Sequence, residues 1–137
     1  MSGVLYWDTS AILSSLLQDV HTSEARGRLR SDQVHLASSL AGSEFHACLA
    51  RLERDGHLSP SATDATAEAF AQGPWRRLTL IPDAGLFRPL ASRPHLRGAD
   101  LWHLALTVSL RTELPEITLL TYDSALRSAA VAEGLAT

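Results

Sequence analysis

The feature that most constrains the fold of this chain is the run Val4-Leu5-Tyr6-Trp7, which is apolar at all four positions and ends directly at Asp8. A short apolar run without polar alternation is typical of a strand buried on both faces, as in a parallel sheet covered by helices. The residues Asp8-Thr9-Ser10 favour a helix start, because Asp is a preferred N-cap residue. We therefore predict a strand at 4–7 that passes into a helix at Asp8.

The same alternation of short strands and amphipathic helices continues along the chain. Apolar runs predict further strands over 34–37, 75–81 and 117–120. Helical spacing, N-cap residues and glycine stops predict helices over 9–17, 24–30, 40–55, 60–70, 101–108 and 124–133, with a short helix and a loop in 83–97. This order indicates an α/β fold, a three-layer αβα sandwich with a central parallel sheet, built as a single domain over 1–137.

Composition and charge exclude several classes of function. The net charge of −3 argues against binding nucleic acid through a broad basic surface. The chain has twelve basic residues, all of them arginine, so mechanisms that need a lysine ammonium group are excluded. The single cysteine, Cys48, cannot form an intramolecular disulfide or build a zinc site by itself.

The start of the chain favours a cytoplasmic protein. No basic stretch precedes the apolar run at 4–7, and Asp8 interrupts that run long before it could form a signal segment or a membrane span. We therefore expect no membrane association.

Acidic residues follow the predicted strands and occupy the first turns of predicted helices. Asp8 and Asp123 come directly after strands, and the carboxyl ends of parallel strands form the edge of the sheet where ligands bind. Asp100 begins a strongly amphipathic helix, and Glu44 lies early in another. All four acids are therefore expected to converge on one cleft.

Each of these acids, taken alone, has a structural explanation. Asp is a favoured N-cap residue, and acids near helix N-termini are stabilised by the helix dipole. Four carboxylates brought together would repel one another, which favours a cation among them. Oxygen-only ligation favours Mg²⁺ or Mn²⁺, and such ions support hydrolysis of phosphodiester bonds by activating water.

Four segments in this order resemble a known family. They are L-Y-W-D-T-S-A at the amino end, S-E in an early helix, L-R-G-A-D-L-W-H-L-A, and L-T-Y-D near the carboxyl end. The D-T-S and G-A-D-x-x-H-L-A elements are the most specific of them. The chain thus resembles a PIN domain, and in particular the VapC-type toxins of bacterial toxin–antitoxin pairs, over nearly its whole length.

The resemblance implies an activity and a set of site residues. It implies an endoribonuclease dependent on Mg²⁺ or Mn²⁺, often acting on tRNA or ribosomal RNA, usually a homodimer inhibited by a cognate antitoxin. By the same resemblance, Ser10 and Thr121 match hydroxyl positions that support the site, and His103 matches a position that we interpret as packing. The residues that match the metal-binding and catalytic acids are Asp8, Glu44, Asp100 and Asp123.

Arginine and histidine side chains are further candidates for site residues. Arg97 lies three residues before Asp100 and is the candidate for binding a substrate phosphate, because arginine can grip a phosphate with two hydrogen bonds. The remaining histidines are scattered without partner spacing, and we predict that most lie on the surface. They are His21, His35, His46, His57 and His95.

Two other functions stay open at this point. One is a PIN-like nuclease that acts in RNA processing or on branched DNA through the same four acids. The other is a non-catalytic module that uses the cleft to bind a protein. A repulsive cluster of acids costs stability and has no purpose without a cation, which argues against the second alternative.

Overall fold

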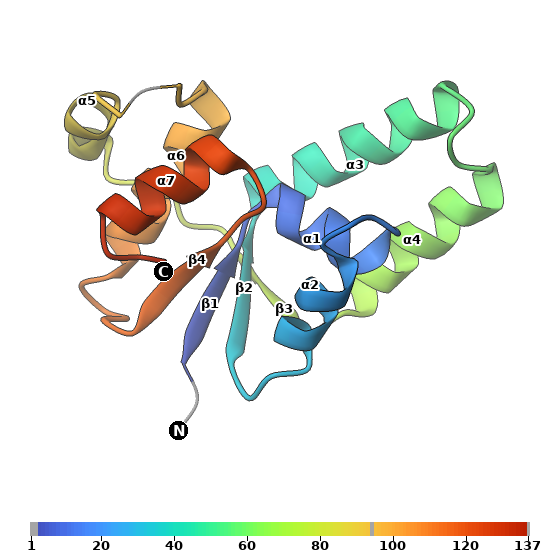
Figure 1. Cartoon of the computed structure of the whole chain (residues 1–137), viewed down its shortest axis with the longest axis horizontal. Helices are drawn as coiled ribbons and strands as arrows, with labels where there is room; N and C mark the ends of the chain where they lie inside the picture. The colour runs from blue at the N-terminus through green and yellow to red at the C-terminus, as the bar shows by residue number, and fades with distance from the viewer. Residues whose placement is uncertain (1–2, 94, 137) are drawn as a thin grey trace.

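A parallel sheet of four strands forms the centre of the molecule (Figure 1). The computed structural model describes residues 3–93 and 95–136. The strands are β1 (Val4–Trp7), β2 (Val34–Ser38), β3 (Trp75–Leu78) and β4 (Ile117–Leu120), in the spatial order β3-β2-β1-β4. Every neighbouring pair is parallel, and the register places Val4 of β1 opposite Val34 of β2 and Ile117 of β4.

Helices cover both faces of the sheet. On one face lie α1 (Thr9–Leu16), α2 (Thr22–Leu29), α3 (Ser39–Arg54) and α4 (Pro60–Gln72). On the other lie α6 (Gly98–Leu110) and α7 (Ser124–Ala132), flanked by the short η1 (Ala84–Leu86) and α5 (Phe87–Leu90). The expected three-layer α/β sandwich is therefore confirmed.

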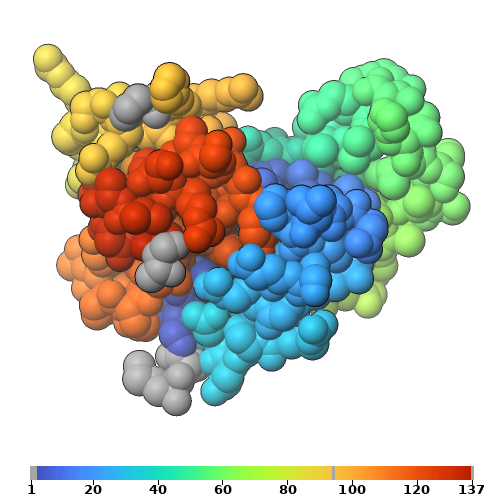
Figure 2. All heavy atoms as spheres, viewed as in Figure 1, coloured from blue at the N-terminus to red at the C-terminus, as the bar shows by residue number. Residues whose placement is uncertain are grey.

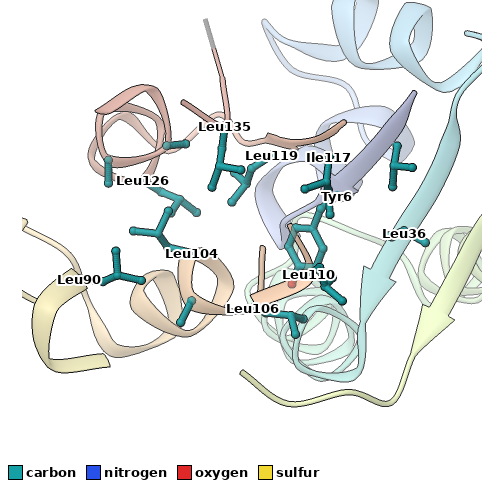
Figure 3. Packing of buried hydrophobic residues seen from close by; sticks show 14 residues of the cluster. Tyr6, Leu36, Leu90, Leu104, Leu106, Leu110, Ile117, Leu119, Leu126 and Leu135 are labelled. Atoms are coloured by element: carbon teal, nitrogen blue, oxygen red, sulfur yellow. The ribbon is translucent and has the colours of Figure 1, made fainter. Parts of the chain in front are cut away.

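Strand β1 shows why the sequence folds this way. Val4 and Tyr6 face the core formed with α6 and α7 (Figure 3), whereas Leu5 and Trp7 face the core under α1, α3 and α4. All four side chains are buried, as an apolar run without alternation requires. Because both faces are covered, each residue of this strand contributes to a hydrophobic core.

The predicted strand over 75–81 is too long. β3 ends at Leu78, which pairs with Ser38, the last residue of β2. β3 is an edge strand, so beyond Ser38 it has no partner strand to continue the ladder. Leu80 and Ile81 are exposed, at 51% and 79% of their surface.

Helices α3 and α4 form an antiparallel arm that extends away from the sheet (Figure 1). Figure 2 shows the surface hollowed between this arm and the part of the molecule formed by α5, α6 and α7. The hollow lies on the side of the molecule toward which the strands run (Figure 1). Nowhere in residues 3–93 and 95–136 does a helix have the length and apolar character needed to cross a membrane.

His35 is the buried exception to the prediction that most of the scattered histidines lie on the surface, since His46, His57 and His95 are exposed. His35 is only 4% exposed, and its Nδ1 accepts a hydrogen bond from Trp7 Nε1 at 3.0 Å. The position lies on β2 directly beside β1, so sheet pairing buries it whatever its polarity. Burial lowers the pKa of His35.

Candidate active site

Four acids from distant parts of the chain line one small pocket at the carboxyl edge of the sheet. The pocket has a volume of about 160 Å³ and is lined by Asp8, Thr9, Ser10, Glu44, Asp100, His103 and Asp123. Asp8 directly follows β1, Glu44 lies in α3, Asp100 in the first turn of α6, and Asp123 between β4 and α7. The structure therefore brings together the four acids that the sequence placed in one cleft.

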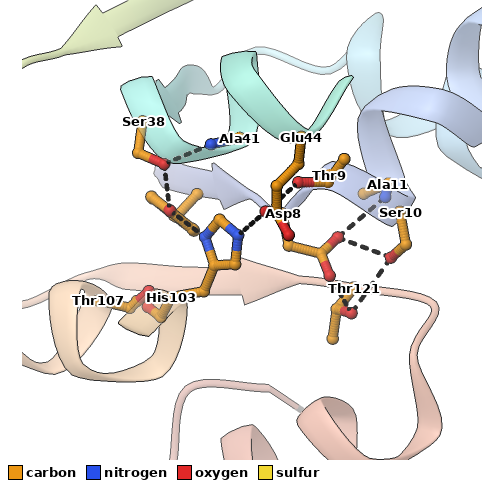
Figure 4. A network of polar contacts seen from close by, with 11 residues as sticks. Asp8, Thr9, Ser10, Ala11, Ser38, Ala41, Glu44, His103, Thr107 and Thr121 are labelled. Carbon is orange, nitrogen blue, oxygen red and sulfur yellow. Dashed lines mark hydrogen bonds and ion pairs between the residues drawn. The ribbon is translucent and has the colours of Figure 1, made fainter. Parts of the chain in front are cut away.

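Asp8 forms the buried part of this site. Its Oδ1 accepts hydrogen bonds from Ser10 Oγ at 2.7 Å and from the Ala11 amide at 2.9 Å, and its Oδ2 accepts from Thr121 Oγ1 at 2.6 Å (Figure 4). Burial raises the pKa of Asp8, and these hydrogen bonds act in the opposite direction by favouring the carboxylate. The carboxylate is thus fixed in place by the first turn of α1 and by Thr121, which follows β4.

Glu44 is held by two donors on a single oxygen. Thr9 Oγ1 donates to Glu44 Oε1 at 2.7 Å, and His103 Nε2 lies 2.8 Å from the same oxygen (Figure 4). The hydrogen bond from His103, followed by that from Thr9, lowers the pKa of Glu44. Glu44 is therefore a carboxylate at neutral pH.

Asp100 and Asp123 repel each other across the pocket. Burial raises the pKa of Asp100, and the negative charge of Asp123 raises it further. Asp123 is exposed, and its Oδ1 caps α7 by accepting from the Leu126 amide at 2.9 Å. The pocket therefore carries two mutually repelling carboxylates on its open side.

Helix N-termini partly offset this charge. Asp8 is the N-cap of α1, Ser38 of α3, Arg97 of α6 and Asp123 of α7. The positive ends of four helix dipoles thus point toward the same edge of the sheet, where they favour carboxylates and anionic ligands. Asp8 and Asp123 can therefore cap their helices and also take part in the site.

The donor chemistry of the pocket fits Mg²⁺ or Mn²⁺. Carboxylate oxygens are the ligands these ions prefer, and the pKa of Asp100 is raised by burial and then by the charge of Asp123, which a cation would offset. Within residues 3–93 and 95–136, no three His, Cys, Asp or Glu side chains lie close enough together to hold a metal ion as placed. Glu44 is instead directed to Thr9 and His103, and Asp8 to three donors of the chain.

The other candidate residues take different positions. Ser10 and Thr121 both bond Asp8, and their hydroxyl oxygens lie 3.3 Å apart. Arg97 is exposed at the N-terminus of α6 and is not among the residues that line the pocket.

The sequence analysis did not name Thr9 as a site residue, and it interpreted His103 as packing, yet both line the pocket. His103 is 2% exposed and contacts Glu44, so the packing role expected for it is incomplete. The available signal was its spacing, because a residue three positions after Asp100 lies on the same helix face.

A larger cavity lies nearby but lacks this chemistry. It has a volume of about 480 Å³ and lies between Arg93 and His95 on one side and the small residues of α7 on the other. Among the described residues that line it there is no carboxylate. The acids, rather than cavity size, identify the candidate active site.

Comparison with known proteins assigns the fold. No protein-family model matches the sequence, and no curated protein matches it significantly. Among solved structures, VapC20 from Mycobacterium tuberculosis, described as a sarcin-ricin loop cleaving toxin, is similar with a TM-score of 0.59 at 17% identity. The match covers 91% of this chain and 94% of VapC20. The chain therefore shares the PIN-like fold of VapC20.

A second PIN-fold match supports this assignment. FitAcB from Neisseria gonorrhoeae is similar with a TM-score of 0.59 and 17% identity, over 93% of each chain. Both matches extend over nearly the whole chain, so the PIN fold includes the arm as well as the sheet. The fold implied by the sequence resemblance is confirmed.

Proposed function

We propose that this chain is the endoribonuclease toxin of a toxin–antitoxin pair and hydrolyses RNA phosphodiester bonds with Mg²⁺ or Mn²⁺. The observation that carries the proposal is the convergence of Asp8, Glu44, Asp100 and Asp123 on one pocket. The fold shared with VapC20, a toxin that cleaves the sarcin-ricin loop, adds support. By analogy, tRNA or ribosomal RNA is the proposed substrate.

Each acid has a distinct part in this proposal. The four carboxylates would together hold the cation, which when bound would acidify water and neutralise charge on the phosphate. Asp8 is the most rigid of them, because three hydrogen bonds fix both of its oxygens. Asp123 and Asp100 lie toward solvent, where RNA would enter the pocket. The helix N-termini around the pocket would attract the phosphate backbone.

Arg97 is the proposed contact to RNA outside the pocket. It is exposed beside the first turn of α6, which carries Asp100. An arginine here would bind a phosphate near the scissile bond with two hydrogen bonds. This would supply local positive charge in a chain whose net charge is −3.

The proposal includes a cognate antitoxin and a homodimer. An acid-lined pocket is complementary to an arginine side chain, so an antitoxin could inhibit by placing an arginine among the carboxylates. The exposed Leu80 and Ile81 beyond β3 are apolar side chains that a subunit interface would cover. Light scattering of the purified chain measures the oligomeric state directly.

The experiment that tests the proposed function is cleavage of total cellular RNA by the purified protein. Reactions are run with Mn²⁺, with Mg²⁺, and with a chelator. Asp100→Asn serves as the control for contaminating nuclease, because it removes one pocket acid while keeping the size of the side chain. Discrete fragments that require both the metal and Asp100 would establish the activity.

Two negative outcomes have different meanings. A folded protein that binds Mn²⁺ but leaves all RNA intact would point to DNA, and the ribonuclease proposal would be abandoned. A folded protein without measurable Mn²⁺ binding would remove the four-acid metal site.

A further inference from the structure

A chain of buried polar side chains leads from the pocket into the core. His103 Nε2 contacts Glu44 Oε1 at 2.8 Å, and its Nδ1 lies 2.6 Å from the Tyr6 hydroxyl oxygen. The Tyr6 hydroxyl donates to Ser38 Oγ at 2.9 Å, and Ser38 Oγ accepts from the Ala41 amide at 3.1 Å (Figure 4). This series of hydrogen bonds therefore joins β1, β2, α3 and α6 behind the active site.

The burial of this chain points to a function. Tyr6, Ser38 and His103 are at most 2% exposed, and buried polar groups cost free energy unless each is satisfied. An apolar side chain at position 103 could be buried without that requirement. At the pocket, this series of hydrogen bonds ends at Glu44, one of the four acids, which His103 contacts.

The direction of the bond to Glu44 follows from the chemistry of the partners. An ionised carboxylate only accepts hydrogen bonds, so His103 Nε2 carries a hydrogen and donates it. On the other side of the ring Nδ1 contacts the Tyr6 hydroxyl, so Nε2 is the ring nitrogen that faces Glu44.

The two donors determine which oxygen of Glu44 accepts hydrogen bonds from the protein. Thr9 of α1 and His103 of α6 both donate to Oε1. Oε2 is not engaged by either of them. Two donors on one oxygen restrain the rotation of the carboxylate and leave the other oxygen for a further ligand.

We infer that His103 is a positioning residue: it orients Glu44 so that Oε2 serves a divalent cation, and Tyr6 and Ser38 fix the imidazole in place. This inference rests on the proposed function, because it assigns Glu44 to a metal site. Outer-shell partners of metal ligands typically alter metal affinity by about 10-fold to 100-fold when removed. His103 is such a partner, and Tyr6 is the support behind it.

Mn²⁺ titration of the full chain by calorimetry tests the inference without relying on RNA cleavage. The variants are Tyr6→Phe, His103→Leu, His103→Gln, Glu44→Gln, and the double variants of Glu44→Gln with Tyr6→Phe and with His103→Leu. Tyr6→Phe removes one hydroxyl and keeps the ring. His103→Gln keeps an N–H donor and tests rescue. Thermal unfolding verifies that each variant is folded.

The expected result is a loss of Mn²⁺ affinity of about 10-fold in His103→Leu, a smaller loss in Tyr6→Phe, and partial recovery in His103→Gln. In the Glu44→Gln background the two losses should disappear, since His103 acts through Glu44. If His103→Leu does not fold, the cycle between Tyr6→Phe and Glu44→Gln decides alone.

Two results would overturn the inference, and they are distinguishable. Wild-type affinity in a folded His103→Leu and in Tyr6→Phe, or losses that simply add to that of Glu44→Gln, would show that His103 does not position Glu44 while the metal site stands. Absence of Mn²⁺ binding by the wild-type protein would instead remove the proposed metal site, and the inference with it.

Discussion

Thr121 donates its hydroxyl hydrogen to Oδ2 of Asp8 across 2.6 Å and so joins the end of β4 to the end of β1. The two residues are 113 positions apart in the sequence. Thr121 Oγ1 also accepts from the Asp123 amide at 3.0 Å. One hydroxyl therefore connects two of the four acids and sets their relative position.

Replacing this hydroxyl should destabilise the protein. Thr121→Val keeps the shape of the side chain but leaves Asp8 Oδ2 and the Asp123 amide without this partner. A buried group that loses its hydrogen bond costs about 1–3 kcal/mol. Urea unfolding should show a loss of this size, whereas Thr118→Val within β4, the matched control, should change stability by less. An equal effect in both variants would contradict the assigned role.

Asp100→Asn should not destabilise the protein in metal-free buffer. Burial and the charge of Asp123 raise the folded-state pKa of Asp100. Its contribution to stability is therefore fully present below its unfolded pKa of about 3.9 and is lost as the pH rises through the folded value. At pH 7 the ionised side chain therefore opposes folding.

Thermal unfolding with a chelator measures this effect. We expect the Tm of Asp100→Asn to equal or exceed that of the wild type at pH 7, with the advantage vanishing near pH 3. Asp64→Asn, at an exposed acid of α4, is the control. A clear fall in Tm for Asp100→Asn would mean that the acid acts mainly in helix structure.

His35 should make the protein sensitive to mild acid. Its folded-state pKa is lowered by burial, so its contribution to stability is present above the unfolded pKa of about 6.5 and is lost as the pH falls toward the folded value. The free energy of unfolding should therefore decrease between about pH 7 and pH 5. His35→Gln, which does not titrate, should show a smaller decrease over the same range in urea titrations. Parallel slopes would assign the acid sensitivity elsewhere.

Arg97→Ala should weaken RNA binding without changing the fold. Binding of bulk tRNA is measured in the Asp100→Asn background, so that cleavage does not interfere. Removing one phosphate contact should lower the affinity and reduce the slope of log K against log salt by about 1. Arg88→Ala on α5 removes the same charge at an exposed site and serves as the control. Unchanged affinity in Arg97→Ala would remove this residue from the proposed RNA contact.

Local sequence determined most of the elements of this protein. The apolar run at 4–7, the cap at Asp8, the Ser59-Pro60 helix start and the glycines at 56 and 134 act over a few residues, and each lies where such signals place it. The alternation of strands and helices then limits the fold to a covered parallel sheet. The order of strand ends likewise brings Asp8 and Asp123 to one edge, which is why their meeting was predictable.

Only the tertiary structure decided what depends on neighbours far apart in the chain. β3 stops at Leu78 because β2 provides no further partner, and His35 is buried because β2 lies beside β1. The bonds from Thr9 and His103 to Glu44 and from Thr121 to Asp8 join segments 35 to 113 residues apart. Sequence spacing predicts the face of a helix or strand on which a side chain lies, but the partner it meets depends on how the elements pack.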